Sequence, residues 1–362
     1  MLETNAPAQM IANARCRNGR NGETLAEPEE REAAVVTPLR YAIPGRGLAL
    51  EPPGFPRSGP SRYPASMSSQ RDLLRFEGEP PKLERPFLVM HLAGWTDSGA
   101  AGQTAMSFLQ ARWNASPIAH FDTDELIDYR GRRPVVRLAV GTIEAVTWSE
   151  IELSLGTTVD GLRDALLLSG PEPDFRWHRF ADRVALLCQE LGVTEVFGLG
   201  AFPAPSLHTD PVAVVSTSAD PELASQLERV PAIVELAASI QSVLEERLHR
   251  AGIPATGLWA RVPPYLAGGT YPPAALALIR ILERLAGVAI DVTELEAATK
   301  EHIEQVEQAI RERPQIAEFV EQIRNMVEQG ADQRLPSGDE IADELERFLS
   351  QQPPPDDGNH SR

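Results

Sequence analysis

The residues best placed for chemistry begin in a polar turn that follows an apolar run. The run Phe87–Leu92 is typical of a strand buried on both faces, and the turn after it carries Gly94, Trp95 and Asp97. Ligands bind open α/β sheets at the carboxyl ends of the strands, so Asp97 is a candidate ligand contact. Alternatively, Asp97 caps the following helix and Trp95 fills space, and the sequence favours this structural interpretation.

The glycine spacing of this turn does not indicate a nucleotide site. Gly94 and Gly99 fit the first part of a P-loop, but Ala100 and Ala101 stand where Lys and Ser/Thr must follow. The groups that hold the terminal phosphates and magnesium are therefore missing. The dinucleotide fingerprint G-x-G-x-x-G does not follow the strand either.

Three further polar residues follow expected strands or precede helices. Asp122 comes directly after the expected strand Ile118–Phe121, in an acidic cluster that either ligates magnesium or caps a short helix, and we favour the cap. Asp174 either faces the same crevice, with Trp177 beside it, or is a turn residue. His208 lies on a proline-rich loop and is the histidine best placed to contact a ligand.

A complete catalytic constellation does not accompany these residues. The G-x-S-x-G pattern of a serine nucleophile is absent from the sequence. The two cysteines, Cys16 and Cys188, are too few for a disulfide framework or a cysteine zinc site. We therefore favour a protein that is not an enzyme, and we expect no catalytic residue, no cofactor and no metal.

The composition limits the partners. A formal net charge of −18 argues against a nucleic-acid surface, which needs clustered Lys and Arg. The apolar runs are too short for a transmembrane helix, and the N-terminus does not read as a secretory signal. We expect a cytoplasmic protein whose partners are proteins or small ligands.

The elements that must position the polar residues alternate between strand and helix patterns from Pro86 onward. This alternation predicts an α/β fold with a mainly parallel sheet. We expect four segments: a disordered extension (1–84), an α/β body (85–290), an acidic helical subdomain (291–350) and a disordered tail (351–362).

The helical subdomain carries a possible contact surface. The stretch Asp291–Leu349 holds 16 acidic and 6 basic residues. Its last expected helix places Ile341, Leu345 and Phe348 at i, i+4 and i+7. This stripe either docks into a groove of a partner or packs within its own subdomain.

Five phrases, taken in order, resemble the proteasome assembly chaperone 2 family in its actinobacterial form. They are GWTDSGAAGQTA (94–105), FDTDELIDYR (121–130), LSGPEPDFRW (168–177), GLGAFPAPSLHTDP (198–211) and RVPPYLAGGTYPPAA (261–275). The resemblance implies a three-layer α/β/α sandwich similar to that of purine nucleoside phosphorylases, followed by helices. It also implies protein partners, with proteasome subunits as candidates, and self-association, with a trimer as the candidate size.

Two functions follow from the sequence. The leading hypothesis is a non-enzymatic, homo-oligomeric protein similar to proteasome assembly chaperones, which acts through protein–protein surfaces. The alternative is a small-ligand-binding protein or enzyme with a polar site at the carboxyl ends of the sheet strands. Its candidate residues are Gly94, Trp95, Asp97, Asp122, Asp174 and His208.

Overall fold

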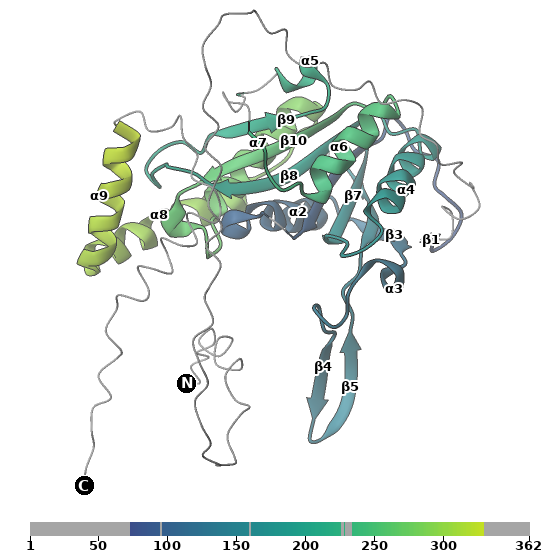
Figure 1. Cartoon of the computed structure of the whole chain (residues 1–362), viewed down its shortest axis with the longest axis horizontal. Coiled ribbons are helices and arrows are strands. Elements are labelled where there is room, and N and C mark those ends of the chain that lie inside the picture. Colours follow the sequence, from purple (N-terminus) through teal and green to yellow (C-terminus); the bar gives the residue numbers. More distant parts are fainter. Residues whose placement is uncertain (1–72, 95, 159–160, 226–227, 229–233, 329–362) are drawn as a thin grey trace, which may run out of the picture. The chain divides into compact units, whose positions relative to one another are not determined.

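The core of the protein is an eight-stranded sheet (Figure 1). The computed structural model describes residues 73–94, 96–158, 161–225, 228 and 234–328. The strands are ordered β1-β3-β6-β7-β2-β8-β10-β9. Their bounds are Leu74–Phe76 (β1), Phe87–Ala93 (β2), Ser116–Phe121 (β3), Glu152–Thr157 (β6), Asp164–Pro171 (β7), Glu195–Pro203 (β8), Val214–Thr217 (β9) and Ala255–Val262 (β10).

The sheet is mixed, and the expectation of a mainly parallel sheet is wrong. Strands β7, β2, β8 and β10 lie side by side in this order and run parallel to one another. The other pairings, β1/β3, β3/β6, β6/β7 and β9/β10, are antiparallel. For β6 and β7 the reason is the length of the connection: they are joined by residues 158–163 alone, and a parallel crossover needs a dozen residues or more.

Helices cover both faces of the sheet. Along β2, Phe87 and Val89 belong to the core beneath α2 and α7, while Leu88 and Met90 belong to the core beneath α4 and α6. This double burial explains the uninterrupted apolar run of β2. The helices of the body are Ala101–Arg112 (α2), Thr123–Leu126 (α3), Trp177–Glu190 (α4), Pro221–Ala224 (α5), Ile240–Arg250 (α6) and Pro272–Ala286 (α7).

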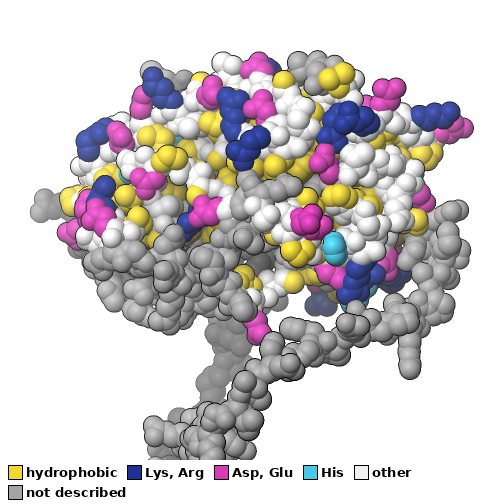
Figure 2. Space-filling view, turned by 90° about the horizontal axis from the view of Figure 1, so that it is seen from above, with side chains coloured by type: hydrophobic (Ala, Val, Ile, Leu, Met, Phe, Trp, Pro, Cys, Tyr) yellow, Lys and Arg dark blue, Asp and Glu magenta, His cyan; other side chains and the backbone are white. Residues whose placement is uncertain are grey.

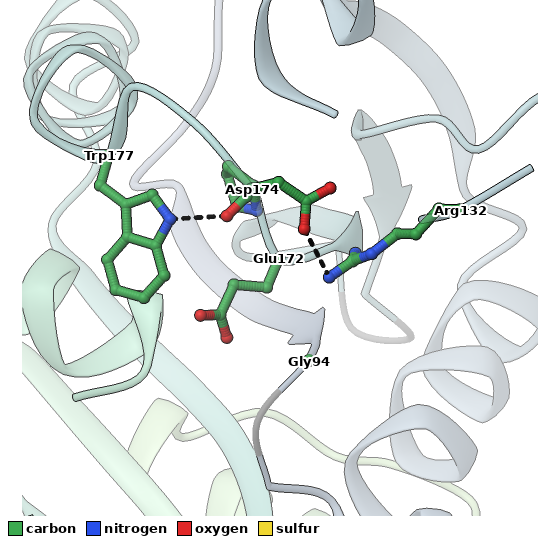
Figure 3. A pocket seen from close by; sticks show the side chains of 6 residues that line it. Gly94, Arg132, Glu172, Asp174 and Trp177 are labelled. Carbon is green, nitrogen blue, oxygen red and sulfur yellow. Dashed lines mark hydrogen bonds and ion pairs between the residues drawn. The ribbon is translucent and has the colours of Figure 1, made fainter. Parts of the chain in front are cut away.

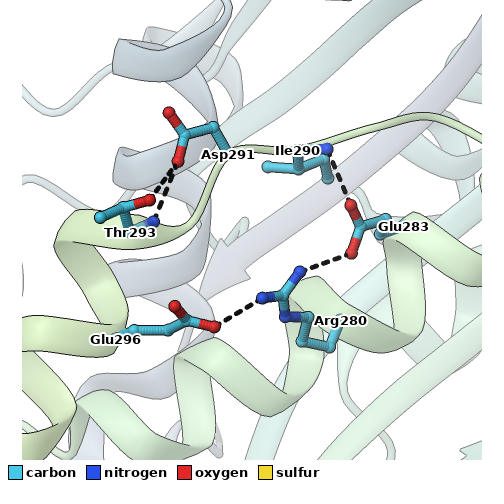
Figure 4. Close-up of polar contacts among 6 residues, drawn as sticks. All are labelled: Arg280, Glu283, Ile290, Asp291, Thr293 and Glu296. Atoms are coloured by element: carbon cyan, nitrogen blue, oxygen red, sulfur yellow. Dashed lines mark hydrogen bonds and ion pairs between the residues drawn. The ribbon is translucent and has the colours of Figure 1, made fainter.

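Two helices follow the body, α8 (Thr293–Glu312) and α9 (Pro314–Glu328). Figure 4 shows how α7 is joined to α8: the Arg280 guanidinium contacts Glu283 at 2.9 Å and Glu296 of α8 at 2.6 Å. The other oxygen of Glu283 accepts the Ile290 N–H, and this bond, with Arg280, lowers the pKa of Glu283. The partner-binding candidates Ile341, Leu345 and Phe348 lie outside the described residues.

The first described strand begins earlier than the sequence predicted. Leu73 and Leu74 are buried, so ordered structure starts inside the stretch 1–84. All described residues belong to one compact unit, Tyr63–Arg362. Within them, no helix is both long and apolar enough to cross a membrane.

A separate hairpin projects from the body between β3 and β6 (Figure 1). It consists of β4 (Val135–Ala139) and β5 (Thr142–Thr147), which pair only with each other in an antiparallel ladder. The tip residues Val140 and Gly141 have φ of 47° and 79°, as a type I′ turn requires. We call residues 135–147 the hairpin arm.

Arg163, which begins the approach to β7, is a buried cation held by four acceptors. Its guanidinium donates to the carbonyls of Arg85 and Ala286, to the Glu195 carboxylate at 2.6 Å and to the Thr194 hydroxyl at 2.8 Å. The same group lies 4.8 Å from the centre of the Phe87 ring. One side chain thus joins the starts of β2, β7 and β8 to the end of α7.

Glu245 of α6 is a buried acid beside strands β9 and β10. Its carboxylate accepts from Thr217 at 2.8 Å and from Gln241 at 3.3 Å, and Trp259 donates to the Thr217 hydroxyl. Burial raises the pKa of Glu245 from 4.5 to about 7, although these two hydrogen bonds oppose the rise. A side chain on Gly257 would collide with this carboxylate.

Glu245 should make the protein less stable as the pH rises from about 4.5 to about 7. In this range the folded chain holds a proton that the unfolded chain has released, and the loss amounts to about 3 kcal/mol in total. In urea unfolding at pH 5 and pH 8, E245Q should show a smaller decline than the wild type. The neighbour Glu246, whose side chain is 44% exposed, supplies the control, since E246Q should keep the full decline. Equal declines in the wild type and E245Q would contradict the assignment.

Candidate functional site

A pocket of about 390 Å³ lies where β2 and β7 end (Figure 3). Gly94 directly follows β2, and Glu172 and Asp174 follow β7, which runs parallel to β2. The pocket is therefore at the carboxyl edge of the parallel strands, where the sequence predicted a polar site. Its lining residues are Gly94, Arg132, Glu172, Pro173, Asp174 and Trp177.

The charges of the pocket are arranged as one ion pair and one further carboxylate. Asp174 accepts the Asp128 N–H at 2.8 Å and faces the Arg132 guanidinium at 3.3 Å. Glu172 is buried and lies against Gly94, where an added Cβ would be 2.6 Å from its Oε2. Glycine at position 94 is therefore what allows the carboxylate to occupy this place.

Trp177 supplies the aromatic wall of the pocket. Its indole N–H donates to the Pro173 carbonyl at 2.6 Å, which fixes the ring at the start of α4. In Figure 3 the Glu172 carboxylate lies between this ring and Gly94. A carboxylate beside an aromatic face is an arrangement that recognises cationic groups.

Asp97 is not part of this pocket. Its carboxylate accepts the N–H groups of Gly102 at 2.7 Å and Gln103 at 3.0 Å, and so it caps α2. The chain reaches α2 through the 3₁₀ helix Ser98–Ala100, in which Gly99 and Ala100 have φ of 65° and 45°. The structural interpretation of Asp97 therefore agrees with the geometry.

His91 lies beneath this cap. It is 3% exposed, its Nδ1 donates to the Leu199 carbonyl at 3.0 Å, and its Nε2 is 3.6 Å from the Asp97 carboxylate. A Cβ at Gly102 would be 2.5 Å from the imidazole. Gly102 thus lets the helix start directly over the histidine, which explains one small residue of the phrase GWTDSGAAGQTA.

Asp122 and His208 occupy two other places. The Asp122 carboxylate faces Arg75 at 3.7 Å and makes no capping hydrogen bond to α3, although Asp122 is at the N-cap position. His208 accepts at Nδ1 from the Tyr265 hydroxyl at 2.8 Å, and the same hydroxyl accepts the His208 backbone N–H at 2.9 Å. Burial lowers the pKa of His208. The neighbouring Leu207 and Tyr265 pack against α9.

The structure therefore brings together only part of the set predicted from sequence. Gly94 and Asp174 line the pocket, with Trp177 beside them, while Asp97, Asp122 and His208 make contacts elsewhere. Trp95 lies outside the described residues. Sequence reasoning missed Arg132 and Glu172. Glu172 was detectable as a carboxylate directly after a buried strand, but Arg132 is brought in by the folding of the chain before the hairpin arm.

The fold and the site define a mixed α/β protein with a small polar pocket at the carboxyl edge of its parallel strands. The model of the PAC2 family matches residues 91–310. The chain therefore belongs to the PAC2 family, as its five phrases indicated.

Solved structures of actinobacterial proteins are similar to this chain. Rv2714 of Mycobacterium tuberculosis, a protein of unknown function, is 28% identical with a TM-score of 0.67, over 77% of this chain and 92% of that one. Rv2125 of the same organism, a proteasome-assembly chaperone homologue, is 32% identical with a TM-score of 0.60, over 65% and 99%. A PAC2 family protein of Streptomyces avermitilis is 34% identical with a TM-score of 0.56, over 62% and 95%. Among curated proteins, none matches this chain.

The capping role of Asp97 predicts a loss of stability on truncation. D97A should lower the free energy of unfolding by about 1–2 kcal/mol, because the first turn of α2 loses an acceptor for two N–H groups. D122A is the matched control: its carboxylate makes no capping bond, and its loss should stay within about 0.5 kcal/mol. Urea unfolding measures both. Similar losses in the two variants would mean that Asp97 does not act as a cap.

Proposed function

We propose that this chain is a non-enzymatic, homo-oligomeric protein similar to proteasome assembly chaperones, which acts through protein–protein surfaces. Its membership of the PAC2 family and its similarity to Rv2125, a proteasome-assembly chaperone homologue, support this class. The observation that carries the proposal is the hairpin arm. As part of it we propose that proteasome subunits are partners, that the protein is cytoplasmic, and that its fold resembles that of purine nucleoside phosphorylases.

The hairpin arm exposes apolar side chains that a monomer would leave in water. Val135 is 70% exposed, Leu138 63%, Ile143 63%, and Val140 at the tip is fully exposed. In the body most apolar residues instead form two cores on either side of the sheet, and on the face seen in Figure 2 the exposed hydrophobic side chains are scattered among polar and charged ones. Leu138 and Ile143 are paired across the two strands, so their side chains form an exposed apolar patch on one face of the arm, and such a patch marks an interaction surface.

The arm is suited to a second copy of the same chain. An isolated two-stranded hairpin is only marginally stable in water, so the arm gains from any surface that covers it. Its outer strand edges also present unpaired N–H and C=O groups, which another strand can pair. Every copy carries the same arm at the same place, so repeated contacts between copies can close into a small symmetric ring. A trimer is the size that we propose.

The mass of the full chain in solution tests this proposal. The wild type should sediment as an oligomer at micromolar concentration, whereas the double variant L138S/I143S should sediment as a monomer with unchanged circular dichroism. The control is L236S, which removes an even more exposed leucine outside the arm (77% exposed) and should leave the oligomer intact. A monomeric wild type, or an oligomer that survives L138S/I143S, would overturn the proposed role of the arm.

The partner is tested separately with the tagged full chain in lysate of its own host. Proteasome subunits should be recovered by the wild type and identified by mass spectrometry. Repeated recovery of none would remove the proteasome from the proposal while leaving the oligomer in place.

A second candidate function is the binding of a small cationic ligand in the pocket, favoured by the position of Glu172 between Trp177 and Gly94. Arginine, agmatine and putrescine at millimolar concentration should raise the melting temperature of the wild type, because a ligand of the folded state stabilises it. E172Q should abolish the shift. The control E125Q changes a carboxylate that pairs with Arg176 and should retain it. If none of the three amines shifts the wild type, the pocket is not a cation site.

A further inference from the structure

A histidine surrounded by three carboxylates lies on one face of the sheet edge formed by β1, β3 and β6. His120 of β3 is directly opposite Glu152 of β6 in the register of the two strands. Glu150 precedes Glu152 by two positions, with the fully buried Ile151 between them. Because side chains alternate along an extended chain, both carboxylates point to the side opposite Ile151, where His120 lies.

The backbone holds these side chains in place. The Phe121 N–H donates to the Ile151 carbonyl at 2.9 Å, which fixes β3 against the stretch that carries the two carboxylates. Gly170 of β7 lets the carbonyl of Glu150 approach closely, since any side chain there would collide with it. The fourth residue, Glu77, follows β1, and its N–H donates to the Ile118 carbonyl of β3 at 2.9 Å.

The contacts of the imidazole determine which nitrogen carries a proton. His120 Nε2 is 2.8 Å from the Glu77 carboxylate, and a hydrogen bond between them requires the proton on Nε2. In the neutral imidazole, Nδ1 then presents its lone pair. It faces Glu150 at 3.7 Å and Glu152 at 3.6 Å, which are acceptors as well.

A carboxylate that holds the far nitrogen of a histidine is the usual partner of a metal-ligating imidazole. It fixes the tautomer and the orientation of the ring. At this sheet edge Glu77 is the carboxylate that holds the far nitrogen, Nε2. On the Nδ1 side of the ring, three electron-pair donors converge: Nδ1 itself and the carboxylates of Glu150 and Glu152. The ligand atoms of His120, Glu150 and Glu152 all lie within 4.8 Å of one another.

The spacing also suits a tetrahedral ion. With bonds of about 2.0–2.1 Å, two ligand atoms of a tetrahedral zinc site are roughly 3.4 Å apart. The distances from Nδ1 to the two carboxylates, 3.6 and 3.7 Å, are close to this separation. Small side-chain rotations would complete the geometry, because these residues are partly exposed, with 35% for His120, 56% for Glu150 and 27% for Glu152.

The neighbouring cation does not replace a metal here. Arg75 of β1 is opposite His120 in the register, but its guanidinium faces Asp122 at 3.7 Å. Glu150 and Glu152 lie on the same side of the chain, so two carboxylates are close together at a point where a divalent cation would relieve their repulsion.

We infer that His120, Glu150 and Glu152 form a binding site for a divalent transition-metal ion, with Zn²⁺ as the probe and Glu77 as the outer carboxylate. One imidazole nitrogen and two carboxylate oxygens leave a fourth position for water. The ion would join β3 to β6 at the edge of the sheet and, through Glu77, hold the short strand β1.

Calorimetric titration of Zn²⁺ into the full chain, after treatment with a chelator, tests the site. H120Q should weaken the wild-type affinity by about 100-fold or more, because the nitrogen ligand is lost. E77Q leaves all three ligands and should weaken it by about 10–100-fold, through loss of the outer carboxylate alone. E150Q, at an exposed position, provides a second ligand variant if H120Q does not fold.

The matched control is H178Q, which removes an exposed histidine of α4 that lies outside the cluster. It should bind Zn²⁺ as the wild type does, and Zn²⁺ should raise the melting temperature of both. No binding by the wild type at micromolar Zn²⁺ would overturn the inference. Binding that H120Q and E150Q leave unchanged would do the same, because the ion would then be held elsewhere.

Discussion

The rest of the structure depends on one buried guanidinium, which holds the central strands of the sheet together. Arg163 satisfies two carbonyls, one carboxylate and one hydroxyl that come from three different segments. A buried cation without its partners costs several kcal/mol, so these segments cannot separate while Arg163 stays inside. The amino ends of β2, β7 and β8 are thereby fixed to the end of α7. Because the parallel strands are rigid, the opposite edge is fixed as well, and that edge carries the pocket and the cap of α2.

The structural features that depend on the local sequence pattern could be predicted from the sequence. The apolar run after Pro86, the glycine-containing turn and the helix that follows it were expected from periodicity, backbone freedom and capping, and the structure has all three. Strand direction was not predictable in the same way, because an antiparallel edge strand and a parallel one share the same alternation of side chains. The antiparallel pairing of β6 and β7, for example, follows from a short connection that becomes visible only when the strand bounds are known.

Contacts between residues far apart in the sequence could not be predicted from the sequence either. Arg132 reaches Asp174 from a distant segment, and no spacing in the sequence relates the two. His120 and Glu152 meet because of strand register, which a shift of one residue would abolish. Asp97, in contrast, caps a helix within its own segment, so local reasoning was sufficient to favour that role.

The tip of the hairpin arm bears on how long a newly made chain survives in the cell. Val140 is a β-branched residue held at positive φ with its side chain fully in solvent, so it combines local strain with an exposed apolar surface. If copies cover one another's arms, newly made chains at low abundance remain uncovered for longer than chains made when copies are plentiful. Uncovered chains are the ones that quality-control proteases and holdase chaperones bind. The lifetime of each chain would then depend on the concentration of other copies, and chains made at low concentration would be degraded first.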